Sequence, residues 1–248
     1  MTATNTHKAP KKGKLLPWAT AIMLVVGIAV LAAFYWNKNV TVDEVSFSGN
    51  VMTNVEKLFE QADVPMGVHP DSLDLSTIIK RIEQIDYVKK ASPYVEPSGE
   101  LNIQIIERNP IALLVHDGKK IYVDSEGVKL PILDGKTFDL PLVYGFDTSD
   151  KNDTLKSDAF IQISTFLMDA RENKFGWMTI SEVAYNAEEG VVALSQENGV
   201  KLLFGNYYYR IKLENWEAFY TEVIRVKGIQ AMQQVDLRFT NQVVTREG

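Results

Sequence analysis

The most constraining feature of this sequence is an uncharged run that follows a lysine-rich start. Residues 15–37 contain no Asp, Glu, Lys or Arg, and Leu15 to Trp36 are almost all apolar. As a helix this run would be about 33 Å long, enough to cross a hydrocarbon core of about 30 Å. Trp18 lies near one end and Phe34, Tyr35 and Trp36 at the other, the depths that aromatic rings prefer. The sequence therefore predicts a transmembrane helix over residues 15–36.

Charges on the two sides of this run predict its orientation. Residues 1–14 carry four lysines and no acid, whereas 22 basic and 32 acidic residues follow residue 37, a net charge of −10. The positive-inside rule therefore makes residues 1–14 a cytoplasmic tail and places the rest outside. The alternative is a cleaved signal peptide, for which Ala29 to Ala33 supply small residues. Since the apolar segment of a signal peptide spans only about 7–15 residues, we expect an uncleaved anchor.

Composition excludes several kinds of chemistry. The 248 residues carry a net charge of −6, whereas nucleic-acid-binding surfaces have surplus positive charge. The chain has no Cys, which excludes disulfides, Cys-bound zinc, iron–sulfur clusters and thiol nucleophiles. His7, His69 and His116 have no second His or carboxylate at ligand spacing. We expect no metal site, no cofactor and no nucleic-acid partner.

Motifs of catalysis are also missing from the sequence. It contains neither a G-x-S-x-G nor an S-x-x-K nucleophile pattern with its partners, nor a glycine-rich phosphate loop. Sequence order leaves open a Ser/His/Asp arrangement and a two-carboxylate hydrolase. However, no pair among the 32 acids is selected by its spacing, and Glu188-Glu189 beside Gly190 fits an exposed turn. We therefore expect a protein that is not an enzyme.

Residues 40–108 show a pattern of the order β-α-α-β-β. Apolar alternation predicts the strands, and an apolar face at helical spacing or a capping box predicts the helices. The expected elements are a strand from Val42 to Phe47, a helix from Thr53 to Ala62, a helix around Leu75–Ile85, and strands at Tyr87–Val95 and Leu101–Ile105. Two helices would then pack on one face of a small sheet.

Residues 109–246 alternate short apolar runs with glycine-containing turns, which predicts an antiparallel β-rich domain. The runs are Ile111–Val115, Lys120–Val123, Val183–Tyr185, Val191–Leu194, Lys201–Phe204, Gln234–Phe239 and Val243–Thr245. Two amphipathic helices are expected within it, at 154–171 and 210–226. The whole chain is thus of the α+β class.

Two segments are candidates for partner binding. The aromatic run Tyr207 to Tyr209 fits either an exposed patch or packing between a strand and a helix. In the last segment, apolar and polar residues alternate from Val235 to Phe239, and a turn at Asn241-Gln242 leads to a final strand. Such a strand often lies at a sheet edge, where unpaired N–H and C=O groups can accept another chain's strand. Alternatively, Arg246 and Glu247 blunt this edge.

Five short motifs follow the predicted anchor in a fixed order. They end in a Gly-Asn turn, an E-R-x-P junction, a V-D-x-x-G hairpin, an L-P-x-x-x-G segment and a V-D-L-R-aromatic strand. They lie at Val42–Asn50, at Tyr87–Ala91 with Leu101–Pro110, at Tyr122–Gly127, at Asp139–Gly145 and at Val235–Phe239. Together, and in this order, the motifs resemble the bacterial cell-division family FtsQ/DivIB.

This resemblance implies a POTRA domain at residues 40–108 and a β domain at 109–246. It also implies a non-enzymatic scaffold in the bacterial inner membrane, at the division septum, that docks FtsB and FtsL, which act on FtsW and FtsI. In the family, FtsB adds a strand to the C-terminal sheet edge. By residue matching, the implied contacts are Val235, Leu237, Arg238, Phe239, Val243, Val244, Thr245 and Arg246.

The chain departs from the family pattern at its end. Gln242 stands where many relatives have Gly, and the chain stops almost directly after the last strand. These departures favour the edge pairing over any single side-chain contact. A different function compatible with the sequence is that of a membrane-tethered envelope assembly factor or chaperone, although such a protein would be expected to carry repeated POTRA units.

Overall fold

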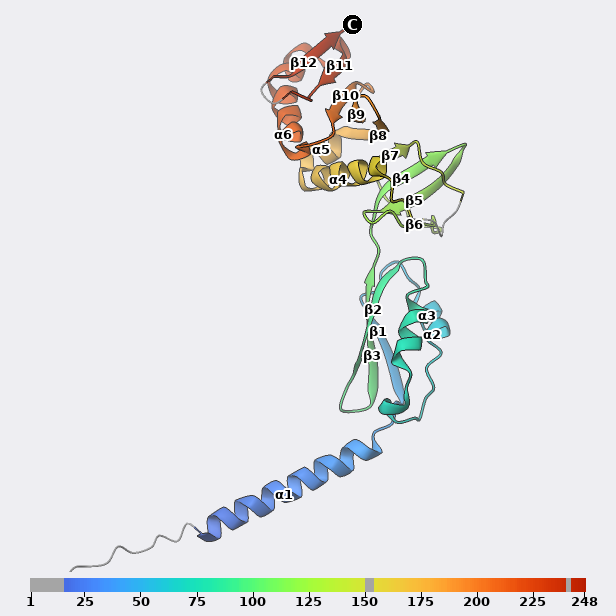
Figure 1. The fold of residues 1–248 in the computed structure, drawn as a ribbon, viewed down its shortest axis with the longest axis vertical. Helices are drawn as coiled ribbons and strands as arrows, with labels where there is room; N and C mark the ends of the chain where they lie inside the picture. Colours follow the sequence, from blue (N-terminus) through green and yellow to red (C-terminus); the bar gives the residue numbers. More distant parts are fainter. Residues whose placement is uncertain (1–15, 150–153, 240–241) are drawn as a thin grey trace, which may run out of the picture. The chain divides into compact units, whose positions relative to one another are not determined.

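The computed structural model describes residues 16–149, 154–239 and 242–248, which form two compact units. The first unit contains the described residues up to Gly49 together with 55–82 and 91–105. The second contains 50–54, 83–90 and the described residues from 106 onward. Figure 1 shows the elements of both units in chain order. The expected cytoplasmic tail, residues 1–14, lies outside the described residues, and the expected domain borders stay predictions.

The first described element is a long helix, α1 (Leu16–Asn39). It begins one residue after the start of the apolar run, and its side chains from Trp18 to Leu31 are exposed. No helix among the described residues combines the length and the apolar character needed to cross a membrane. The transmembrane helix expected at residues 15–36 therefore stays a prediction.

A three-stranded sheet with the strand order β1-β3-β2 follows α1. The predicted order β-α-α-β-β is observed. The elements are β1 (Glu44–Ser48), α2 (Val55–Ala62), the 3-10 turn η1 (Pro70–Ser72), α3 (Leu75–Ile82), β2 (Val88–Val95) and β3 (Glu100–Glu107). Strand β1 runs parallel to β3, with Val45 opposite Leu101. Every second residue of β3 is buried, which confirms the predicted half-buried strand.

The second unit is built on a nine-stranded sheet with the order β12-β11-β10-β9-β8-β7-β4-β5-β6. Its strands are β4 (Pro110–His116), β5 (Lys119–Asp124), β6 (Lys129–Leu130), β7 (Leu142–Tyr144), β8 (Ile180–Asn186), β9 (Gly190–Ser195), β10 (Lys201–Gly205), β11 (Met232–Asp236) and β12 (Val244–Glu247). Compared with the predicted runs, β11 begins and ends earlier, and β7 was not predicted as a strand.

This sheet is mixed, so the prediction of an antiparallel β domain is wrong. Strand β7 runs parallel to both β4 and β8, and β10 runs parallel to β11. The reason lies in the connections, because a parallel pair needs a long crossover whereas an antiparallel pair can be joined by a tight turn. Helices connect β7 to β8 and β10 to β11.

The crossover helices begin and end differently from the predicted ones. The predicted helix at 154–171 is α4 (Asp158–Glu172), which starts four residues later because the Ser157 side chain caps it; Thr154 instead bridges to Val128. The predicted helix at 210–226 is α6 (Tyr209–Phe219), continued by the π-helical turn η2 (Tyr220–Ile224) and α7 (Arg225–Lys227). A short helix, α5 (Lys174–Thr179), and the turn η3 (Ile229–Ala231) were not predicted.

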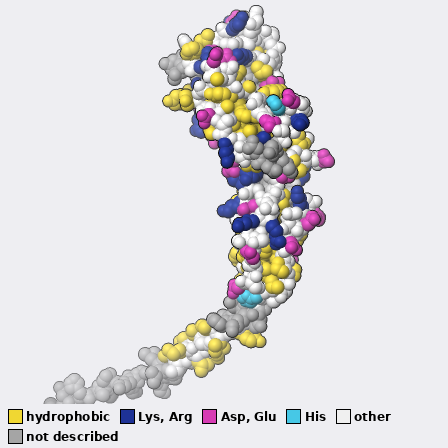
Figure 2. All heavy atoms as spheres, turned by 45° about the vertical axis from the view of Figure 1, so that its right-hand side comes forward, with side chains coloured by type: hydrophobic (Ala, Val, Ile, Leu, Met, Phe, Trp, Pro, Cys, Tyr) yellow, Lys and Arg dark blue, Asp and Glu magenta, His cyan; other side chains and the backbone are white. Residues whose placement is uncertain are grey.

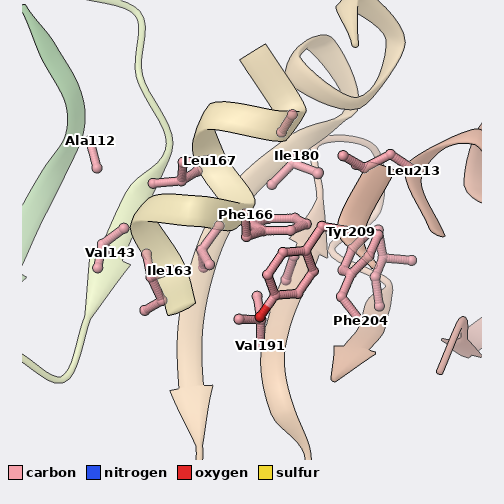
Figure 3. Packing of buried hydrophobic residues seen from close by; sticks show 14 of the residues in the cluster. Ala112, Val143, Ile163, Phe166, Leu167, Ile180, Val191, Phe204, Tyr209 and Leu213 are labelled. Carbon is pink, nitrogen blue, oxygen red and sulfur yellow. The ribbon is translucent and has the colours of Figure 1, made fainter. Parts of the chain in front are cut away.

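The core of the second unit lies between the sheet and the helices α4 to α6. Figure 3 shows Phe166 of α4 pointing toward Phe204 of β10 and Tyr209 of α6. The ring centroid of Phe166 lies 4.6 Å from that of Phe204 and 5.4 Å from that of Tyr209. Trp216 is fully buried, and its indole N–H donates to Thr179 Oγ1 of α5. Helices α4, α5 and α6 are thus fixed to the sheet by shared aromatic packing.

The E-R-x-P motif explains why residues 50–54 belong to the second unit. The carboxylate of Glu107 accepts backbone N–H bonds from Val51, Met52 and Thr53 at 2.9, 2.8 and 2.7 Å. Burial raises the pKa of Glu107, but these three bonds outweigh burial and hold the pKa below its usual value. Lys136 donates to the carbonyl oxygens of Val51 and Met52, both at 2.9 Å.

The neighbouring Arg108 joins the same motif to the V-D-x-x-G hairpin. Its Nη1 donates to Asp124 at 2.8 Å and to Glu126 at 3.0 Å, while Asp124 Oδ1 accepts the backbone N–H groups of Glu126 and Val128. Tyr87 packs against the same region and donates to the carbonyl oxygen of Pro131. Two motifs distant in sequence therefore meet in one hydrogen-bonded cluster.

Candidate partner-binding edge

The candidate site is the edge formed by the last strand of the large sheet. Strand β12 pairs antiparallel with β11, Val244 lying opposite Asp236 and Arg246 opposite Gln234. On its other side β12 has no neighbouring strand among the described residues. The opposite edge strand, β6, is only two residues long and both are buried, whereas three of the four residues of β12 are exposed. Of the two edges, β12 therefore offers the accessible backbone.

The residues matched to partner binding divide into exposed and buried groups. Val244 and Phe239 are large apolar side chains with 43% and 44% of their surface exposed, and Arg246 is exposed as well. Val243 and Thr245 are partly buried. Val235 and Leu237 are fully buried in the core, so their side chains hold the strand in place and are not accessible to a partner.

Arg238 lies beside this edge, but a carboxylate of its own chain already binds it. Its Nη2 and Nε donate to Asp236, at 2.6 Å to Oδ2 and 2.9 Å to Oδ1. These hydrogen bonds raise the pKa of the Arg238 guanidinium. Burial raises the pKa of Asp236, but its hydrogen bonds from Arg238 outweigh burial and lower the pKa overall. A partner carboxylate at Arg238 would therefore have to share this guanidinium with Asp236.

A cavity of about 620 Å³ opens between α6, the segment after β10 and Arg238. Its lining includes Asn206, Tyr207, Tyr208 and Lys212. The tyrosine run divides at this point, because Tyr209 is buried and donates to Gln162 at 2.6 Å, while Tyr207 and Tyr208 are exposed. Of the two interpretations of the run, packing thus applies to Tyr209 and an exposed patch to the other two.

Lys212 is a site residue that sequence reasoning missed. It lies four residues before the buried Trp216, and this spacing places it on the apolar side of α6. A charged residue on the apolar side of a helix was the signal in the sequence that could have identified Lys212. Burial lowers the pKa of its ammonium group, which donates to the carbonyl oxygen of Phe204 at 2.6 Å.

The acidic and histidine side chains of the described residues were candidates for a metal site. Among the described residues, no cluster of three or more His, Cys, Asp or Glu side chains could hold a metal ion. His69 Nδ1 accepts the backbone N–H of Asp71, and His116 is half-exposed beside Asp117; His7 lies outside the described residues. Figure 2 shows basic and acidic side chains interspersed on the visible face, without a large area of one sign.

Comparisons with known proteins agree on one family. The family model "FtsQ/DivIB, C-terminal related" matches residues 109–246, more than half of the chain. The chain is 27% identical to the "Cell division protein FtsQ" of Rhodothermus marinus, covering 99% of this chain and 93% of the relative. It is 25% identical to the "Cell division protein FtsQ" of Salinibacter ruber, covering 90% of each.

A solved structure is also similar, the major extracytoplasmic domain of the cell division protein DivIB from Geobacillus stearothermophilus. It is 19% identical with a TM-score of 0.33, covering 48% of this chain and 97% of that one. The family match over residues 109–246 and the near full-length relatives together lead to one conclusion: this chain belongs to the FtsQ/DivIB family of bacterial cell division proteins.

Proposed function

We propose that this chain is a single-pass scaffold of the divisome that binds FtsB and FtsL and thereby helps to control septal peptidoglycan synthesis. One observation carries the proposal: β12 ends a nine-stranded sheet, and one side of its backbone has no neighbouring strand among the described residues. An edge strand of this kind can bind an extended segment of another protein through main-chain hydrogen bonds. Membership in a cell-division family supports this assignment.

Side chains next to the edge would add specificity to this backbone pairing. Val244 and Phe239 are exposed apolar groups that a partner strand would cover. Arg246 and Arg238 would face acidic groups of the partner, Arg238 while still bound to Asp236. Val235 and Leu237 would contribute only indirectly, by packing the strand that β12 pairs with.

The remaining parts of the chain would place this edge at the septum. In this proposal α1 (Leu16–Asn39) is the membrane anchor, with the N-terminus in the cytoplasm and the residues after α1 outside. Residues 40–108 act as a POTRA domain whose outer strands, β1 and β2, contact other division proteins. A fluorescent fusion of the full chain should then concentrate in a band at mid-cell, and a uniform membrane signal would contradict the proposal.

The edge pairing can be tested with prolines at adjacent positions of β12. Along a strand, successive N–H groups alternate between the two sides, so Val244→Pro and Thr245→Pro remove N–H groups that point in opposite directions. One variant removes a donor to β11, and the other removes a donor on the free side. We expect the variant that removes the donor on the free side to lose FtsB binding, while its free energy of unfolding stays close to that of the wild type.

Hydrogen exchange identifies which of the two N–H groups is bonded to β11, because that amide exchanges slowly. Binding is measured with the full chain in detergent and with FtsB from the same organism. Undiminished capture of FtsB by both variants would overturn the edge pairing. Loss of capture in both variants, each with a native unfolding transition, would also support β12 as the contact.

A further inference from the structure

The loop that follows α2 is exposed although its side chains are entirely apolar. Residues 64–68 read Val-Pro-Met-Gly-Val and contain no charged or hydrogen-bonding side chain. Pro65, Met66 and Gly67 are exposed, Met66 with 51% of its surface. A Cβ at Gly67 would meet nothing within 4 Å, so the described chain leaves open space at this position. A contiguous apolar surface of this kind is a frequent sign of a contact with something outside the chain.

Hydrogen bonds hold both ends of this loop. On the N-terminal side, Arg81 of α3 donates through Nη2 to the carbonyl oxygens of Ala62 and Asp63, at 2.5 and 3.2 Å. On the C-terminal side, the backbone N–H of Asp71 donates to Nδ1 of His69, which caps η1. The exposure of the apolar tip is therefore a property of the folded loop and does not result from a loose end.

The same loop is attached to the segment that leaves α1. The N–H of Val42 donates to the carbonyl oxygen of Val68 at 2.9 Å, and the N–H of Gly67 donates to the carbonyl oxygen of Val42 at 2.8 Å. Val42 is fully buried, and only two residues separate it from Asn39, the last residue of α1. Since a chain spans at most about 3.6 Å per residue, Val42 lies within about 11 Å of Asn39, whatever direction α1 takes.

This short connection limits how far the loop can lie from the bilayer when α1 is the anchor. The apolar run ends at Trp36, three residues before the end of α1, which is about 4.5 Å of helix. Val42, and with it the loop, therefore lies within about 15 Å of the end of the apolar run. The polar headgroup layer begins at that end and is about 5–8 Å thick, so it is within reach of the loop.

The charges beside the loop disfavour an electrostatic attraction to anionic lipids. Asp63 and Asp71 flank it in the sequence, and their side chains are 82% and 90% exposed. Asp43, next to Val42, is exposed as well. Arg81 is the nearby cation, and it already lies 3.4 Å from Asp63. A contact between this loop and lipid would therefore depend on burial of apolar surface.

We propose that residues 64–68 insert into the interfacial region of the lipid bilayer beside α1, with Met66 as the inserted side chain. This inference rests on one part of the proposed function, the role of α1 as membrane anchor, and FtsB binding plays no part in it. The first unit is then held to the membrane at two points, the chain connection at Asn39 and the apolar loop. The second contact restricts how this unit tilts on the short segment between α1 and Val42.

A spin label tests the depth of the loop. The chain has no Cys, so Met66→Cys accepts a nitroxide at one position only. Val55→Cys is the control, because Val55 is an exposed apolar residue at the other end of α2. The full chain is placed in phosphatidylcholine vesicles, and the label's collisions with oxygen and with a water-soluble nickel chelate are measured. We expect the ratio of oxygen to nickel collisions to be at least about threefold higher at position 66 than at position 55.

A second arm uses the unaltered chain, so that it does not depend on how a variant folds. Met66 and Met178 are similarly exposed, at 51% and 65%. A membrane-impermeant oxidant such as chloramine T converts exposed methionines to the sulfoxide, which mass spectrometry quantifies at each position. Both residues are compared within the same vesicles, so the sidedness of insertion affects them equally. We expect Met66 to be oxidised at least about fivefold more slowly than Met178, because lipid covers it.

The composition of the vesicles distinguishes lipid from other occupants. Protection of Met66 that disappears when the chain is diluted in lipid would assign the contact to a second copy of the chain and overturn the proposal. Replacing part of the phosphatidylcholine by phosphatidylglycerol should leave both results nearly unchanged. A strong gain in protection with this anionic lipid would contradict a contact that depends on apolar burial.

The outcomes also separate this inference from the proposed function. If the wild-type chain does not float with the vesicles, the anchor role of α1 and the loop insertion are both overturned. If it floats, but positions 66 and 55 are equally accessible to the nickel chelate and Met66 is oxidised as fast as Met178, the loop insertion alone is wrong and the anchor stands.

Discussion

The carboxylate of Asp236 binds the guanidinium of Arg238 two residues further along the chain, with Nη2 donating to Oδ2 at 2.6 Å. The backbone N–H of Arg238 also donates to Oδ1 at 3.0 Å, and the intervening Leu237 donates its N–H to the carbonyl oxygen of Leu203. These bonds fix the path of the chain as it leaves β11. The V-D-L-R motif therefore determines where the segment leading to β12 begins, in addition to any contact with a partner.

Replacing Asp236 by Asn should destabilise the second unit. The residue is 5% exposed, and the substitution removes the negative charge that Arg238 binds. Losing a buried charged hydrogen-bond partner typically costs about 1–3 kcal/mol of unfolding free energy. Urea unfolding measures this loss, and Asp117→Asn is the control because the Asp117 side chain is 87% exposed. Equal unfolding free energies for the two variants would contradict this role of Asp236.

The same pair predicts how stability depends on pH. The pKa of Asp236 in the folded chain lies below its ordinary value, so this group binds a proton more readily when unfolded. Its stabilising contribution is complete above the unfolded pKa of about 3.9 and is lost as pH falls through the folded pKa. The difference in unfolding free energy between wild type and Asp236→Asn should therefore shrink below about pH 4. A difference that widens on acidification would contradict this assignment.

Elements with a local pattern were predicted, and pairings between distant segments were not. Alternation at Leu101, Ile103 and Ile105 identifies a half-buried strand without reference to the rest of the chain, and all three are buried. By contrast, β7 has three residues, too few to show a period. That β10 and β11 lie parallel depends on the helical crossover between them, which a strand-by-strand interpretation does not consider.

The candidate site was predicted to a similar extent. The alternating residues near the chain end indicated a last strand, and the structure has β12 there. No local pattern indicated that Arg238 folds back onto Asp236, because residues two apart can lie on the same face of a strand or diverge. Nor could a local pattern place Lys212 beside Arg238, since these residues are distant along the chain and only packing brings α6 to the segment after β11.

Glu107 should be required to hold residues 51–53. The substitution Glu107→Gln leaves one oxygen in place of the two that accept three backbone N–H groups. We expect a loss of about 1–3 kcal/mol of unfolding free energy, since at least one of these N–H groups loses its charged acceptor. Hydrogen exchange at Val51, Met52 and Thr53 should accelerate while exchange in β8 and β9 stays slow.

A matched control for Glu107→Gln is Glu60→Gln on the exposed side of α2. It removes the same charge from the chain and should leave exchange at residues 51–53 unchanged. If Glu60→Gln accelerated that exchange as much as Glu107→Gln, the effect would come from net charge, and the three hydrogen bonds to Glu107 would not explain it.

Alanine substitutions at Gly127 and Gly118 distinguish the effect of a steric clash from that of backbone strain. Both have a positive φ, 83° and 75°, which disfavours any side chain. A Cβ at Gly127 would lie 2.2 Å from the carbonyl oxygen of Leu155, whereas a Cβ at Gly118 would meet nothing within 4 Å. Gly127→Ala should therefore lower the melting temperature clearly more than Gly118→Ala. Equal shifts would mean that Leu155 moves away freely, despite the 2.9 Å hydrogen bond from its N–H to the carbonyl oxygen of Gly127.

Phe166 should carry more of the stability of the second unit than its neighbours on α4. Its ring is fully buried between Phe204 and Tyr209, and truncation to Ala would leave a cavity at this contact. Such substitutions typically cost about 3–5 kcal/mol. Ile161→Ala on the same helix is the control, because Ile161 is 51% exposed and loses little buried area. Urea unfolding should therefore show a lower midpoint for Phe166→Ala and a nearly unchanged one for Ile161→Ala. Because Phe204 belongs to β10 and Tyr209 begins α6, Phe166→Ala should also speed hydrogen exchange in both elements. A loss of exchange protection confined to α4 would contradict the packing of α4, β10 and α6 as one core.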